Sequence, residues 1–344
     1  MKLSKRKQQI LEAIVEVHIA TAEPVGSRTI ARKYKLGVSP ATIRNEMADL
    51  EEMGLIEQPH TSAGRIPSQQ GYRYYVDQLM QKGSLTEKEE NLIKAVFARQ
   101  VRELATLIQD TIKLVTQLTD YLVFLSGPQL ENATFHQIRF LQLAPQKALL
   151  VVMAESGWVE SKVVDLPVPV TPEELEQITQ VFNSYFRGLT FSQITRTMLR
   201  GVYDELTRKR QLIDLTLEII ETLLTKESAE GLYLGGARNI LKQPEYRDIR
   251  RVRELLDLIE GEEVLKSLLM ETQPTGINVR IGKENKFQEV EDCSVVTAVY
   301  TFGGNVVGAV GLLGPMRMDY ARAIAVIEYI THALSEVLTR SRLL

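Results

Sequence analysis

The apolar and polar positions of the first fifty residues follow the period of an α-helix in three consecutive segments. The first runs from Ser4, a suitable N-cap residue, to about Thr21, and the second begins at Ser27. The third begins at Ser39, ahead of a proline that suits the first helical turn, and ends at Gly54. Because a turn containing glycine separates the last two segments, the pattern predicts a helix-turn-helix unit.

After Gly54 the chain changes to an extended pattern. Two short runs, residues 55–59 and 64–67, flank a polar tip at residues 60–63. Short strands joined by a polar tip directly after a helix-turn-helix predict a hairpin of the kind called a wing. Residues 1–76 are therefore predicted to form a winged helix-turn-helix domain. Because three short helices and a hairpin also build protein-binding modules, the pattern alone leaves that alternative open.

The third predicted helix places polar side chains opposite its apolar stripe, near its N-terminal end. In a recognition helix this end enters the major groove of DNA, where Arg and Asn can each bond two edge atoms of a purine base. We expect Thr42, Arg44 and Asn45 to contact bases. A second set is expected to contact the sugar-phosphate backbone, namely Arg28, Ser39, His60, Thr61, Ser62 and Arg65.

A long helical pattern follows from Glu87. Residues from Val101 to Leu122, apolar except for Thr111, recur at alternating spacings of three and four, which is close to a heptad repeat. One interpretation is a helix that packs within a domain core. The other adds a partner helix across a dimer interface, and the sequence leaves both interpretations open.

Strand-like and helical patterns then alternate in blocks. Strand-like runs lie between 135 and 166, helical periodicity dominates from 171 to about 270, strands resume from 277 to 313, and a last helix covers 320–338. This order predicts an α+β domain that is divided by an insertion. The predicted division is a winged helix at 1–76, the first part of the α+β domain with the long helix at 77–170, a mostly helical inserted domain at 171–274, and the second part of the α+β domain at 275–344.

Charge is distributed unevenly along the chain. Residues 1–73 carry eleven Lys and Arg against eight Asp and Glu, a net charge of +3, which leaves −6 for residues 74–344 because the whole chain carries −3. A positive N-terminal segment followed by a negative remainder favours an N-terminal domain that binds an anionic partner. Because residues 1–73 are only slightly basic, each subunit is expected to make few contacts with DNA phosphates. Tight DNA binding should therefore require a dimer and should depend only moderately on salt.

Little in the composition points to chemistry beyond binding. The single cysteine, Cys293, excludes a disulfide within the chain, and the four histidines stand at 18, 60, 136 and 332 without metal-ligand spacing. The glycine-rich run 233–239 lacks the spacing of a phosphate-binding loop and is predicted as a turn before a helix. No apolar run reaches the roughly 20 residues of a membrane span, so we expect a cytoplasmic protein without catalytic residues, metal or cofactor.

Several stretches resemble the heat-inducible transcription repressor family, HrcA. They are Ser39–Glu51, Gln58–Pro67, Gly71–Asp77 and Val310–Tyr320, so the resemblance reaches both ends of the chain. It implies a winged helix, a GAF-like domain and a segment inserted into that domain. It also implies a homodimer that binds an inverted-repeat operator upstream of chaperone operons and is helped into its active form by the chaperonin.

Two other functions remain open from the residues alone. GAF-like folds often hold small ligands, so one alternative is a transcriptional regulator gated by a small molecule that shifts operator affinity. The second is an enzyme that carries a DNA-binding domain, which would bring ionisable side chains together in a cleft.

Overall fold

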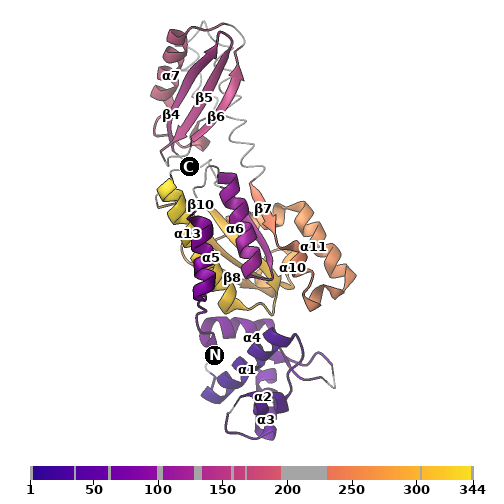
Figure 1. The fold of residues 1–344 in the computed structure, drawn as a ribbon. Coiled ribbons are helices and arrows are strands. Elements are labelled where there is room, and N and C mark those ends of the chain that lie inside the picture. The colour runs from indigo at the N-terminus through magenta and orange to yellow at the C-terminus, as the bar shows by residue number, and fades with distance from the viewer. Residues whose placement is uncertain are drawn as a thin grey trace.

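The computed structural model describes residues 3–34, 36–60, 63–98, 104–127, 134–155, 159–166, 169–194, 231–302 and 304–341. Its described parts form three bodies in a row (Figure 1). The winged helix lies at one end, a domain around a five-stranded sheet lies in the middle, and a smaller body with a three-stranded sheet lies at the other end. The protein therefore mixes helices and strands, as predicted.

The winged helix contains the elements that the sequence predicts. Its helices pack around fully buried apolar side chains, among them Ile10, Ile14, Ile30 and Ile43. Its elements are α1 (Lys5–Thr21), α2 (Ser27–Lys33), α3 (Pro40–Glu52), β1 (Ile56–Glu57), β2 (Ile66–Pro67) and α4 (Gln69–Tyr74), which continues as a π-helix over Tyr75–Leu79.

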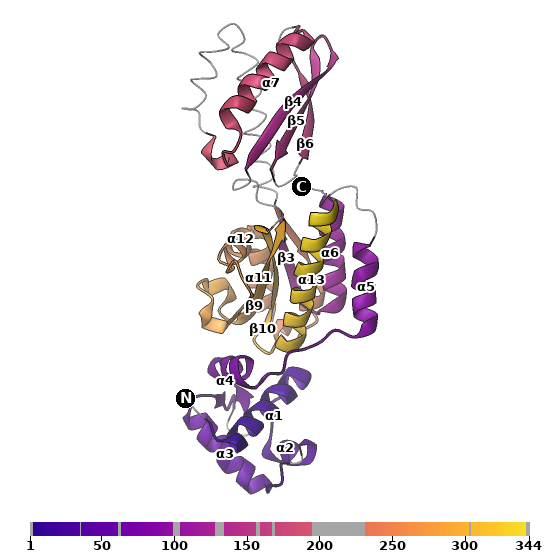
Figure 2. The same cartoon turned by 90° about the vertical axis from the view of Figure 1, so that its left-hand side faces the viewer.

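The central sheet is antiparallel and has helices on both faces (Figure 2). Its strands in spatial order are β7 (Leu232–Gly235), β3 (Leu122–Ser126), β10 (Asn305–Pro315), β9 (Cys293–Phe302) and β8 (Ile277–Ile281). One face packs on α5 (Glu87–Phe97), α6 (Leu104–Leu118) and α13 (Tyr320–Ser341), and the other on α10 (Ala237–Ile240), α11 (Ile249–Gly261) and α12 (Glu263–Met270). Short 3₁₀ turns lie at Phe191–Gln193, Pro244–Arg247, Gly282–Glu284 and Gln288–Val290.

The third body is a sheet with one helix. Its strands β4 (Phe135–Ala144), β5 (Lys147–Ala154) and β6 (Val159–Asp165) pair in this order, all antiparallel, and α7 (Pro172–Phe186) packs on one face. Alternate residues of β5, such as Leu150 and Val152, are buried. This is the period-2 pattern of a strand with one covered face.

The strand pairings place the insertion differently from the predicted range 171–274. In the part of the chain that the structure describes, β4, β5 and β6 pair only with one another, and β7 pairs with β3. The central sheet is therefore interrupted between β3 and β7, and both predicted boundaries are corrected. Alternation identified the strands of 135–166, but it does not reveal which strand pairs with which.

The long helix predicted from Glu87 to about Leu125 is divided in the structure. α5 and α6 lie on either side of residues 99–103, which are outside the described part, and the chain has already become strand β3 at Leu122. Four consecutive side chains from Leu122 to Leu125 are fully buried, as in a strand covered on both faces. Ile108 and Val115 of α6 are also buried, which confirms the core-packing interpretation. A partner helix stays a prediction.

The glycine-rich run 233–239 is part strand and part turn. Residues up to Gly235 belong to β7, which the sequence did not predict, while Gly236 directly precedes α10, as predicted. Gly236 has φ +82°, and a Cβ atom there would lie 2.2 Å from the carbonyl oxygen of Tyr121. Both observations explain a glycine at this position without any phosphate.

The winged helix meets the central domain through an aromatic contact. The ring of Tyr72, on α4, lies 6.0 Å from that of Tyr320, on α13. The Tyr72 hydroxyl is 2.6 Å from Nδ1 of His18, on α1. Burial raises the pKa of Tyr72 well above its usual value, so its hydroxyl stays protonated in this contact.

This contact predicts a loss of stability in mild acid. Burial, and secondly the charge of Arg317, lower the pKa of His18 from 6.5 to about 4. Between these values the unfolded chain binds the proton and the folded chain does not, so the contribution of His18 to stability is lost as pH falls from about 6.5 to 4. We expect His18→Gln to flatten this part of the profile in urea titrations. Identical profiles for the variant and the parent protein would contradict this.

Candidate nucleic-acid interface

Local sequence signals fix both ends of α3. The Ser39 side chain caps its start, accepting a hydrogen bond from the Thr42 amide at 3.1 Å, and Pro40 occupies the first turn. At the other end Gly54 adopts φ +73°, which ends the helix. The helix is therefore well defined before any DNA binds. The Thr42 hydroxyl lies 3.0 Å from that of Ser39, so both predicted contact residues also serve the cap.

The outer face of α3 presents two of the predicted base-reading side chains. Ile43, Met47 and Leu50 are buried against the rest of the domain, whereas Arg44 and Asn45 are exposed on the other side. Neither exposed side chain has a hydrogen-bond or ion-pair partner among the described residues. Both are thus available to a ligand, and their donors and acceptors match the edges of guanine and adenine.

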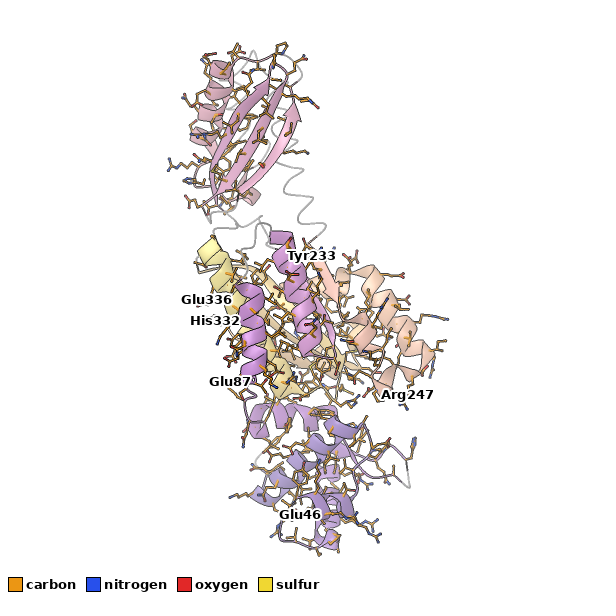
Figure 3. All side chains as sticks on the ribbon, in the orientation of Figure 1. Glu46, Glu87, Tyr233, Arg247, His332 and Glu336 are labelled. Carbon is orange, nitrogen blue, oxygen red and sulfur yellow. The ribbon has the colours of Figure 1, made fainter. Side chains whose placement is uncertain are left out.

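Two of the acidic residues of α3, Glu46 and Asp49, are paired with Lys7 of α1, a contact that the sequence did not predict. The Lys7 amine lies 3.0 Å from Glu46 and 2.9 Å from Asp49. Hydrogen bonds to these carboxylates, first to Asp49, raise the pKa of Lys7. Figure 3 shows Glu46 in the winged helix at the end of the molecule far from the third body. Neutralising these carboxylates lowers their repulsion of a DNA backbone.

The residues predicted to contact the DNA backbone differ in their exposure and in their partners. Arg28 on α2 and His60 at the wing are exposed, while Thr61 and Ser62 lie outside the described residues. Arg65 differs, because its Nε and Nη2 lie 2.9 and 2.8 Å from Oε2 of Glu51 on α3. Its backbone also pairs with Val25. Arg65 therefore fastens the base of the wing to α3, a role that its position in the sequence did not reveal.

Within the described ranges no cluster of three or more His, Cys, Asp or Glu side chains is arranged to hold a metal ion. The described helices also include none that is long and apolar enough to cross a membrane.

A capped helix with an exposed Arg-Asn face, set in three helices and a hairpin, is typical of a winged-helix DNA-binding protein. Residues 2–80 match the family model of the winged helix-turn-helix transcription repressor HrcA, DNA-binding domain, and residues 105–324 match that of the HrcA protein C-terminal domain. The chain belongs to the HrcA family of heat-inducible transcription repressors.

Similar proteins support this assignment over the full length. Heat-inducible transcription repressor HrcA of Pelotomaculum thermopropionicum is 47% identical over 341 residues, which cover 99% of this chain and 98% of that protein. The protein of the same name from Desulforudis audaxviator is 48% identical over 343 residues, with 99% of both chains covered. A crystal structure of a hypothetical protein has 26% identity and a TM-score of 0.67, covering 99% of this chain and 100% of that one.

Proposed function

We propose that this repressor acts as a homodimer on an inverted-repeat operator upstream of chaperone genes. The observation that carries the proposal is that Arg44 and Asn45 are exposed on α3 without a hydrogen-bond or ion-pair partner among the described residues. The helix itself is already capped and packed in the absence of DNA. Arg44 and Asn45 read bases in the major groove. Thr42, on the same helix, also contacts a base, and Arg28, Ser39, His60, Thr61 and Ser62 contact the sugar-phosphate backbone.

The charge of the winged helix supports a dimer. A net charge of +3 over residues 1–73 allows few phosphate contacts for one subunit. Two subunits related by a two-fold axis double these contacts and match an operator with two-fold symmetry. Repression follows by occlusion, because the bound dimer covers DNA that the polymerase needs, and no catalytic step is required.

Membership of a heat-inducible family supports regulation by the chaperonin. If the chaperonin favours the DNA-binding state of the dimer, its capture by unfolded proteins at high temperature lowers the amount of active repressor. Operator affinity is then expected to rise when purified chaperonin is added at constant salt. Equal affinity with and without chaperonin would contradict this part of the proposal.

The dimer itself is tested by comparing three DNA duplexes at one salt concentration. We expect the full inverted repeat to bind at least about 1,000-fold more tightly than a scrambled duplex, and the isolated half-site to bind much more weakly than the full repeat. Fluorescence anisotropy gives the three affinities, and sedimentation gives the stoichiometry. Equal affinity for the full and scrambled duplexes would refute the proposed function. The family assignment also favours repression over gating by a small molecule and over an enzyme.

A further inference from the structure

Arg317 crosses the junction between the winged helix and the central domain. It lies in the turn between β10 and α13, and its side chain is 11% exposed. Its Nε and Nη2 bond the two carboxylate oxygens of Glu245 at 2.6 and 3.1 Å, and Nη2 also bonds Gln243 at 2.7 Å. Its Nη1 donates to the carbonyl oxygen of Ile19 at 3.1 Å. A single guanidinium therefore joins two segments of the central domain to the last turn of α1.

Arg73 crosses the same junction in the opposite direction. It belongs to α4 of the winged helix, and its Nε donates to Glu284 of the central domain at 2.9 Å. Its Nη2 donates to the carbonyl oxygen of Val279 in β8 at 2.6 Å, and Nη1 bonds Asp77 in its own helix. Nearby, the Lys283 amide donates to the Gln69 side chain at 2.9 Å.

The two arginines add directed bonds to an apolar junction. Between the winged helix and the central domain, apolar side chains form one continuous buried cluster, in which the rings of Tyr72 and Tyr320 lie 6.0 Å apart. Beside Arg317 the two domains are separated by a cleft of about 450 Å³, which Glu16 and Tyr75 line from one side and Asp120 and Arg317 from the other. On that side, Arg317 bridges the gap to Ile19. Apolar packing is non-directional, whereas hydrogen bonds from a guanidinium group to a carboxylate and a carbonyl have a defined geometry and can fix an angle.

We propose that Arg317 and Arg73 are positioning residues for operator recognition. They hold each winged helix at one angle to its central domain, and so set the distance and direction between the two recognition helices of a dimer. This inference rests on the proposed dimer. A dimer whose winged helices are held at a fixed angle binds one half-site spacing. A dimer whose winged helices are loosely held binds several spacings, and its affinity falls in proportion to the time that it spends in unsuitable orientations.

The test uses the full chain with Arg317→Met and Arg73→Met, singly and together. The matched control is Arg280→Met, because Arg280 is also 11% exposed and also bonds a carboxylate, Glu271, and a helix carbonyl, but entirely within the central domain. Affinity is measured for the natural inverted repeat, for repeats with two base pairs added or removed between the half-sites, and for one half-site.

The parent protein and Arg280→Met are expected to bind the natural spacing about tenfold more tightly than the altered ones. The double variant should lose most of that preference, to less than about threefold, while half-site affinity stays within about twofold. A double variant that keeps the tenfold preference overturns the positioning role, and so does a parallel loss of half-site binding, which reports a damaged winged helix. If the parent protein does not prefer the inverted repeat at all, the proposed function itself fails.

Discussion

Arg44→Ala is expected to weaken operator binding by about 5- to 150-fold, equivalent to about 1–3 kcal/mol, and to remove the preference for one base pair in each half-site. Arg44 is exposed on α3, opposite the buried stripe, and has no partner within the described residues. Alanine should therefore remove a DNA contact without disturbing the domain. The measurement is a set of anisotropy titrations with operators in which each base pair is changed in turn.

Arg28→Ala is the appropriate comparison for this variant. Arg28 is also an exposed arginine of the winged helix, but it lies on α2 and is proposed to contact the backbone. Its loss should weaken binding to all sequences equally and reduce the salt slope by about 1, with base preferences unchanged. If Arg44→Ala kept the affinity and base preferences of the parent protein, α3 would not be the recognition helix.

Gly71→Ala is expected to destabilise the winged helix by about 2–4 kcal/mol. A Cβ atom at this position of α4 would lie 2.0 Å from the carbonyl oxygen of Leu55. That carbonyl cannot move away easily, because it accepts a hydrogen bond from the Ser68 amide and the Leu55 amide donates to Leu50. The close approach joins α4 to the start of the wing, so the variant should also lose operator binding. Urea unfolding followed by circular dichroism measures the change.

Gly26→Ala provides the control within the same domain. A Cβ atom at Gly26 meets nothing within 4 Å, and the residue has φ −94° as the N-cap of α2. The expected cost is below about 1 kcal/mol. Equal unfolding midpoints for the two glycine variants would show that the contact with Leu55 does not constrain α4.

The winged helix could be predicted from the sequence because its signals are local. Ser39 caps α3 through a hydrogen bond to a residue three positions away, and Gly54 ends the helix through its own backbone conformation. Spacing alone also placed Ile43 and Leu50 on the buried face. Arg44 and Asn45 followed as the exposed face, since a helix has only one opposite side.

Features that depend on distant residues could not be predicted in this way. The pairing of β3 with β7 joins segments more than a hundred residues apart, and the alternation of each strand carries no information about its partner. The ion pair of Arg65 with Glu51 could not be predicted either, because it forms only where the wing packs against α3. Similarly, Lys7 reaches Glu46 only because α1 packs across α3. These contacts arise from tertiary packing rather than from local propensity.

Footprinting on promoter DNA of the host's chaperone operons tests the central claim most directly. If Arg44 and Asn45 of two subunits read an inverted repeat, the parent protein should protect two symmetry-related half-sites, with their centres separated by about one helical turn or a multiple of it. Arg44→Ala should remove that protection at the same protein concentration. Protection that is uniform along the DNA, or the same in scrambled sequence, would contradict the account.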